Sequence, residues 1–192
     1  VGAPQNGGSA TGKSYVVYGT TGTPSINLAN VASGVGGFVI TGQCAADWSG
    51  FTTSNAGDVN GDGLADLLIG SYGRTNATNT TFPGSSYVVF GRTSGTAIDL
   101  SAVAVGSGGF VINGQCANDQ SGFSVSSAGD VNGDGFDDLI VGAPKGNKYG
   151  ALYASFMDEK RLEVVGLAPL RRDLAAVAAI KTKAAPMSTD IW

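Results

Sequence analysis

The sequence contains no histidine, and this absence removes several classes of function at once. Without imidazole, Ser-His-Asp and Cys-His catalysis are excluded, and so is metal ligation by histidine. Charged residues make up only 14% of the chain and the net charge is −4, so no basic surface for nucleic acid is expected. No run of about 18 apolar residues occurs, which argues against a membrane-spanning helix and membrane insertion.

Glutamate is also missing from most of the chain, although aspartate is not. Residues 1–154 contain ten Asp and no Glu, and most of these Asp lie in two windows, 58–66 and 130–138. A solvated surface would scatter its acidic residues and would include Glu. The clustered Asp residues instead indicate that a cation is bound.

What the chain has in abundance is glycine, 31 residues in all, between short apolar runs. Many turns between short runs that are rich in Val, Ile, Phe and Tyr favour an all-β fold. The hydrophobic content of 42% is enough for a core, and 192 residues is the length of one domain.

A long internal repeat organises this β pattern. A shift of 72 positions aligns residues 12–72 with 84–144 without a gap, and more than half of the aligned pairs are identical. The Gly-Phe-Val-Ile segment at 37–40, for example, recurs at 109–112. Repeats of this kind indicate a modular architecture rather than one irregular domain.

Each repeat contains four short apolar runs that predict strands. The predicted strands are 12–19, 37–42, 50–55, 66–70, 86–91, 109–113, 122–127 and 138–143. Four strands per unit are typical of a β-propeller blade. A solenoid is disfavoured because its repeats usually span about 20–50 residues.

The two ends of the chain differ from the repeats. Val-Gly-Ala-Pro at 1–4 recurs at 141–144, which predicts that the chain begins inside a repeat. From about Phe156 the repeat stops, and the spacing between Pro169 and Pro186 predicts a short amphipathic helix. Two interpretations of residues 156–192 stay open: a helical cap over an open blade edge, or a segment foreign to the domain.

The strongest motif is Asp-x-Asn-x-Asp-Gly-x-x-Asp, which occurs once in each repeat. Ca²⁺ takes six to eight oxygen ligands from carboxylates, amides and backbone carbonyls, and glycine at the sixth position allows a sharp turn. The predicted ligands are side-chain oxygens of Asp58, Asn60, Asp62, Asp66, Asp130, Asn132, Asp134 and Asp138, and the backbone carbonyls of Leu64 and Phe136. We therefore expect about two Ca²⁺ ions per chain.

Loops of a different type match this motif less well. A simple Asx-rich surface turn would tolerate many residue orders, whereas both copies keep the same order. An EF-hand needs an acidic twelfth position, which is Ile69 or Val141 here. A dockerin-type loop would be followed by a helix, whereas these loops run into predicted strands. A loop that joins two strands fits best.

With these motifs, residues 1–154 resemble the FG-GAP repeats of integrin α-subunit propellers. The resemblance lies in Gly50–Gly70 and Gly122–Pro144; the second segment ends in Gly-Ala-Pro, and Gly-Ser-Tyr at 70–72 is the degenerate counterpart in the first copy. It implies a partial β-propeller of about two to two and a half four-stranded antiparallel blades in residues 1–155, with repeats at about 12–83 and 84–155. It also implies that the calcium loop joins the first two strands of a blade, on the face opposite the ligand.

The same resemblance implies a function. It suggests a non-catalytic, calcium-binding module, secreted or at the cell surface, that serves adhesion or ligand binding. The expected partners are a protein or carbohydrate ligand and the remaining blades of a parent protein. The alternative is an accessory propeller of a secreted hydrolase, a phospholipase or a polysaccharide-degrading enzyme, whose catalytic domain lies outside this chain.

Several isolated residues also carry predictions. Cys44 and Cys116 occupy equivalent positions, and unbridged thiols are favoured over a disulfide because a bridge needs Cα atoms within about 7 Å. Asn76 and Asn79 match the glycosylation pattern, which also arises by chance. Trp48 has no aromatic counterpart in the second repeat and is a candidate for an exposed contact. The repeated aromatic residues are expected to pack between blades; they are Tyr15, Phe38, Phe51, Tyr87, Phe110 and Phe123.

Overall fold

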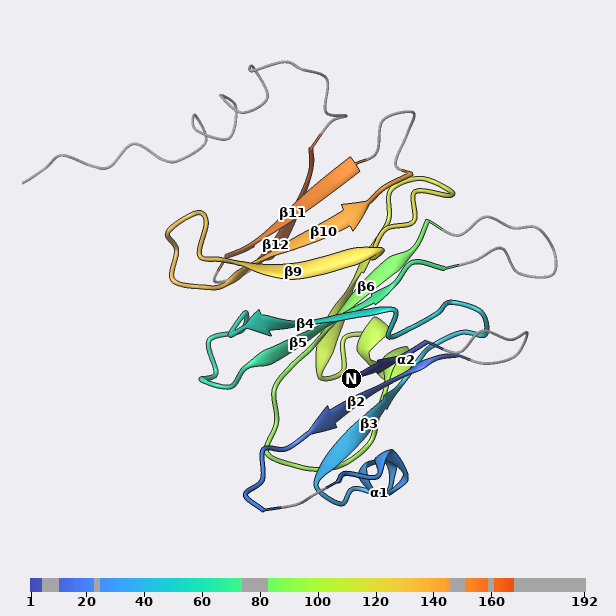
Figure 1. The fold of residues 1–192 in the computed structure, drawn as a ribbon. Helices are drawn as coiled ribbons and strands as arrows, with labels where there is room; N and C mark the ends of the chain where they lie inside the picture. The colour runs from blue at the N-terminus through green and yellow to red at the C-terminus, as the bar shows by residue number, and fades with distance from the viewer. Residues whose placement is uncertain (5–10, 23–24, 74–82, 146–150, 159–160, 168–192) are drawn as a thin grey trace, which may run out of the picture.

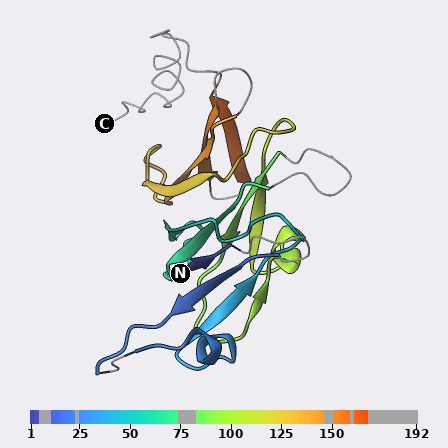
Figure 2. The same cartoon turned by 45° about the vertical axis from the view of Figure 1, so that its right-hand side comes forward.

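The structure, a computed structural model, consists mainly of β-strands in three four-stranded sheets. It describes residues 1–4, 11–22, 25–73, 83–145, 151–158 and 161–167, with the backbone alone described from residue 151 onward. The second sheet lies between the first and the third in both ribbon views (Figures 1 and 2). This succession of four-stranded sheets is that of a partial β-propeller, as the sequence predicts.

The strands follow the predicted runs closely. The first sheet contains, in spatial order, β1 (Gly2–Ala3), β2 (Lys13–Val17), β3 (Gly37–Thr41) and β7 (Ile98–Asp99). The second contains β4 (Thr52–Gly57), β5 (Asp66–Ser71), β6 (Ser85–Val89) and β8 (Gly109–Asn113). The third contains β9 (Ser124–Gly129), β10 (Asp138–Ala143), β11 (Ala151–Asp158) and β12 (Arg161–Leu167). All neighbouring strands are antiparallel except β3 and β7.

The second sheet is covered on both faces, and this explains its continuous apolar runs. In β6, Val88 points toward the third sheet and packs with Leu139, whereas Tyr87 and Val89 point toward the first sheet. Because side chains alternate along a strand, each face of the sheet receives every second residue. The two hydrophobic clusters therefore lie between neighbouring blades, and burial of apolar side chains there holds the blades together.

A segment outside the predicted strands also joins the first two blades. In the linker between β6 and β8, β7 pairs in parallel with β3 of the preceding blade, with Ile98 opposite Ile40. The short helix α2 (Leu100–Ala104) follows, and the Asp99 carboxylate caps it by accepting from the N–H of Ser101 at 2.8 Å. The equivalent helix in the first repeat is α1 (Leu28–Ala32).

The linker between Gly91 and Gly109 makes further contacts with the first blade. The Arg92 guanidinium lies 5.8 Å from the centre of the Phe38 ring, and the Tyr18 hydroxyl donates to the carbonyl of Ser94 at 3.4 Å. These contacts cross from one blade to the next, so the linker between β6 and β8 provides a second contact between blades, outside the sheets.

The C-terminal part of the described chain differs from the expectation of a tail that begins at residue 156. Strand β11 continues to Asp158, and β12 pairs with it from Arg161 to Leu167 as the outermost strand of the third sheet. The sheet pattern therefore continues beyond the end of the recognisable repeat. The predicted helix between Pro169 and Pro186 and the acceptor residues Asn76 and Asn79 lie outside the described residues.

Candidate metal centre

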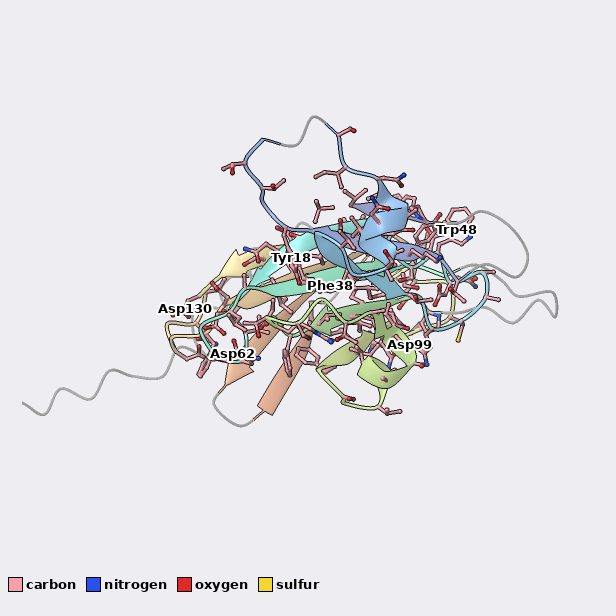
Figure 3. The ribbon with its side chains drawn as sticks, turned by 90° about the horizontal axis from the view of Figure 1, so that it is seen from below. Tyr18, Phe38, Trp48, Asp62, Asp99 and Asp130 are labelled. Atoms are coloured by element: carbon pink, nitrogen blue, oxygen red, sulfur yellow. The ribbon has the colours of Figure 1, made fainter. Side chains whose placement is uncertain are left out.

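The two Asp-rich loops lie at the same end of the molecule. Residues 58–65 connect β4 to β5, and residues 130–137 connect β9 to β10, so each loop joins the first two strands of its blade. Asp62 and Asp130 appear together at one end in Figure 3, with Trp48 at the other. The resemblance predicts this strand connection.

The first loop curls around the Asp58 carboxylate. The N–H of Asp62 donates to its Oδ1 at 3.1 Å, and the N–H of Gly63 donates to its Oδ2 at 2.8 Å. Gly61 and Gly63 have φ values of 74° and 83°, which side chains with a Cβ rarely adopt. The glycines thus provide the tight turn that brings the later residues of the loop back to its first residue.

The next two polar side chains complete this turn. Asn60 Oδ1 accepts from the N–H of Asp62 at 2.9 Å, and Asn60 Nδ2 donates to Asp62 Oδ2 at 2.9 Å. Asp62 Oδ1 accepts from the N–H of Leu64 at 2.8 Å. The side chains at the first, third and fifth positions are therefore all engaged within the loop, where the sequence predicts oxygen ligands.

Asp66, at the ninth position, is fully buried at the start of β5. Its two oxygens accept from the N–H groups of Val59 at 2.9 Å and of Gly91 at 2.7 Å. Burial raises the pKa of the Asp66 carboxyl; the two N–H donors lower it, and the negative charges of Asp62 and Asp58 raise it further. The charges of Asp58 and Asp62 thus act on the buried carboxyl of Asp66.

The second loop repeats these contacts with its own residues. Asp130 accepts from the N–H of Asp134 at 3.1 Å and of Gly135 at 2.9 Å, and Asn132 Nδ2 donates to Asp134 Oδ2 at 2.8 Å. Asp138 is buried and its Oδ2 accepts from the N–H of Val131 at 2.7 Å. Two copies of the motif therefore fold in the same way, as expected if the motif itself determines the loop conformation.

The donor chemistry of both loops fits a hard divalent cation. The predicted ligands of each loop are three carboxylates, one amide oxygen and one backbone carbonyl, with no nitrogen or sulfur ligand. Among the residues that the structure describes, however, no three His, Cys, Asp or Glu side chains are grouped closely enough to hold a metal ion. The side chains instead accept from backbone N–H groups, mostly those of their own loop and, for Asp66, also that of Gly91.

The sequence does not predict the contact between the two loops. Asp137 Oδ2 accepts from the N–H of Asp58 at 3.0 Å, so a side chain of the second loop holds the backbone of the first. A signal was present in the sequence: the eighth position is Ala65 in one copy and Asp137 in the other.

The opposite end of the molecule carries an aromatic cluster of Trp48, Phe51, Tyr72 and Phe123. Tyr72 lies 4.5 Å from Phe51 and 5.4 Å from Phe123, measured between ring centres. Phe51 and Phe123 are 38% and 41% exposed, so they are not core residues, but their ring centres lie 5.3 Å apart across the boundary between the second and third blades, as the predicted packing between blades requires. Each directly precedes the first strand of its blade and therefore lies at one end of the strands.

The remaining predicted residues have simpler outcomes. Phe38 and Tyr87 are buried between the first two blades as predicted. Cys44 and Cys116 are exposed, free thiols, as favoured. Partial burial, and then the charge of Asp47, raises the pKa of the Cys44 thiol.

Comparison with known proteins identifies the repeat. The family model described as "FG-GAP repeat" matches residues 50–89 and 121–154. The chain is 32% identical over 123 residues to integrin alpha-PS2 of Drosophila melanogaster, covering 62% of this chain and 8% of that protein. It is 31% identical over 99 residues to integrin alpha-4 of Xenopus laevis, covering 51% of this chain and 9% of that protein.

The chain thus spans less than a tenth of the length of the curated relatives that it matches. No helix in the described part of the chain is long and apolar enough to cross a membrane. The matched segments contain both Asp-rich loops and the strands on either side of them. This chain carries FG-GAP repeats and is similar to the FG-GAP region of integrin α-subunits.

Proposed function

We propose that this chain is a non-catalytic, calcium-binding propeller module that serves adhesion or ligand binding outside the cell. The observation that carries the proposal is the doubled loop: two copies of one oxygen-rich motif fold alike and lie at one end of the molecule. The similarity to integrin α-subunits supports an extracellular setting and a protein ligand, with further blades as structural partners.

In the first site, the ligands would be the side chains of Asp58, Asn60, Asp62 and Asp66 and the carbonyl of Leu64. The second site would use Asp130, Asn132, Asp134 and Asp138 with the carbonyl of Phe136. A bound Ca²⁺ would supply the positive charge that offsets the repulsion among the three carboxylates of a loop. Because each loop joins two strands, such an ion would also restrain the hairpin that begins its blade.

In the first loop, some of the predicted ligands are held firmly and others make hydrogen bonds that an ion could replace. Asp66 is fixed by two backbone N–H donors, whereas Asp62 and Asn60 hold each other through an exposed side-chain hydrogen bond. Exposed hydrogen bonds of this kind contribute little net free energy, about 1 kcal/mol, so an ion can replace them. The expected affinity is that of extracellular modules, on the order of 10⁻⁴–10⁻³ M.

Isothermal titration with Ca²⁺ tests the proposal. The unmodified chain should bind about two ions, and Asp62→Ala or Asp134→Ala should each remove one site and leave the other. Asp99→Ala is the matched control, because Asp99 is an exposed helix cap outside both loops. Absence of binding at millimolar Ca²⁺, or equal losses with Asp99→Ala, would reject the calcium sites.

A further inference from the structure

The two Asp-rich loops touch each other through the side chain of Asp137. Its Oδ2 accepts a hydrogen bond from the N–H of Asp58 at 3.0 Å, in a partly buried position. We propose that Asp137 is a positioning residue for the cation site of the first loop, although it belongs to the second loop. This inference rests on the proposed calcium binding and adds a residue that is not itself one of the predicted ligands.

The surroundings of this contact show a close fit between the loops. A Cβ at Gly57 would overlap the carboxylate of Asp137, and Gly57 has a φ of 79°. A Cβ at Gly61 would lie 2.9 Å from Cε1 of the Phe136 ring. Gly57 at the end of β4 and Gly61 in the first loop therefore leave room for Asp137 and Phe136 of the second loop to approach.

The contact runs in one direction. The residue equivalent to Asp137 in the first loop is Ala65, which has no side-chain acceptor, and Leu64 replaces the aromatic ring of Phe136. Asp137 therefore distinguishes the two otherwise similar loops: the second loop holds the first, but the first cannot hold a neighbour in the same way.

The role of this contact follows from what Asp58 does in its loop. Asp58 is the first predicted ligand, and its carboxylate is already held by the N–H groups of Asp62 and Gly63. Asp137 accepts from the backbone N–H of the same residue, so both the backbone and the side chain of Asp58 are held in place. Groups that orient metal ligands from outside the ligand shell typically change metal affinity by roughly 10- to 100-fold.

Asp137 also connects the two sites with each other. It stands between Asp134 and Asp138 in the sequence, two predicted ligands of the second site. An ion in the second loop would restrain the segment that carries Asp137 and thereby the N–H of Asp58. Coupling between binding sites is reciprocal, so occupation of the first site should also favour occupation of the second.

Site-resolved nuclear magnetic resonance of the full chain tests this inference. The amide signals of Gly61 and Gly133 report Ca²⁺ binding in the first and second loop separately. Asp137→Ala should lower the affinity of the first loop by roughly tenfold and that of the second loop by much less. Asp137→Asn should restore part of the loss, because its Oδ1 can still accept from the N–H of Asp58.

A second readout needs no calcium. Hydrogen exchange at the amide of Asp58 should be faster in Asp137→Ala than in the unmodified chain and intermediate in Asp137→Asn. Asp99→Ala, which also removes one carboxylate, should leave the exchange rate and both binding midpoints unchanged. It therefore controls for the change in net charge, whereas Asp137→Asn separates the loss of the local charge from the loss of the hydrogen-bond acceptor.

The possible results distinguish failure of the positioning role of Asp137 from failure of the proposed calcium binding. An unchanged first-loop affinity in Asp137→Ala would overturn the positioning role while leaving the calcium sites in place. Equal losses in both loops would also overturn it, because they would indicate general loosening of the fold. If neither glycine signal responds to Ca²⁺ in the unmodified chain, the calcium sites themselves are rejected.

Discussion

The two Asp-rich loops have nearly the same sequence, yet their surroundings differ. Val59, the second residue of the first loop, is 2% exposed and packs in the cluster between the second and third sheets. Its counterpart Val131 is 56% exposed. The motif sets the path of each loop, whereas the neighbouring blade decides how deeply the loop is buried.

The linkers that contain α1 and α2 also differ in burial, although they occupy equivalent positions in the two repeats. Ile98 and Leu100 of the second repeat are 5% and 0% exposed because they pack against the first sheet. Ile26, the counterpart of Ile98, is 48% exposed. Equivalent residues thus contribute unequally to stability, and paired substitutions can measure the difference.

The largest expected effect is in the pair Leu100→Ala and Leu28→Ala. Loss of the fully buried Leu100 side chain should lower the free energy of unfolding by about 2–5 kcal/mol, since it leaves a cavity between two blades. The same change at the half-buried Leu28 should cost about 1 kcal/mol or less. Urea denaturation at a fixed Ca²⁺ concentration measures both, and equal costs would contradict the inter-blade role of the linker.

A smaller contrast is expected for the pair Val59→Ala and Val131→Ala. The buried Val59 should contribute about 2 kcal/mol to stability, whereas exposed Val131 should contribute less than about 0.5 kcal/mol. Chemical denaturation of both variants in a chelating buffer would separate packing from metal binding. A destabilising effect of Val131→Ala as large as that of Val59→Ala would show that the second loop is also covered.

The smallest effect concerns Arg92, which lies over the ring of Phe38 across the blade boundary. Arg92→Ala should destabilise the chain by about 0.5–1 kcal/mol, the lower range for a cation–π contact. The double variant Arg92→Ala/Phe38→Leu should show that the two losses are not additive. Fully additive losses would mean that the guanidinium contributes nothing through the ring.

Much of the fold follows from the sequence because strands and turns are local patterns. The strand at 109–113 is predicted to the residue, and 66–70 is one residue shorter than β5. Glycines and Asp-rich turns separate the strands, and the apolar runs between them are long enough to be buried on both faces.

The remainder depends on contacts between residues distant in sequence. Strand β7 has only two residues and exists because Ile98 pairs with Ile40, 58 positions earlier, on the preceding blade. The contact of Asp137 with Asp58 likewise requires two blades to be in place. The exposure of Phe51 depends on its position just before β4, at one end of the strands, which periodicity alone does not reveal.

The most direct test of the calcium proposal is a thermal melt with Ca²⁺ at about 5 mM beside one with excess chelator, at constant ionic strength. Calcium binds the folded loops and hardly the unfolded chain, so each site should add roughly 1–2 kcal/mol. For two sites, the melting temperature should rise by about 4 °C or more, and by less in Asp62→Ala and Asp134→Ala. Identical melting curves with and without Ca²⁺ would contradict the account.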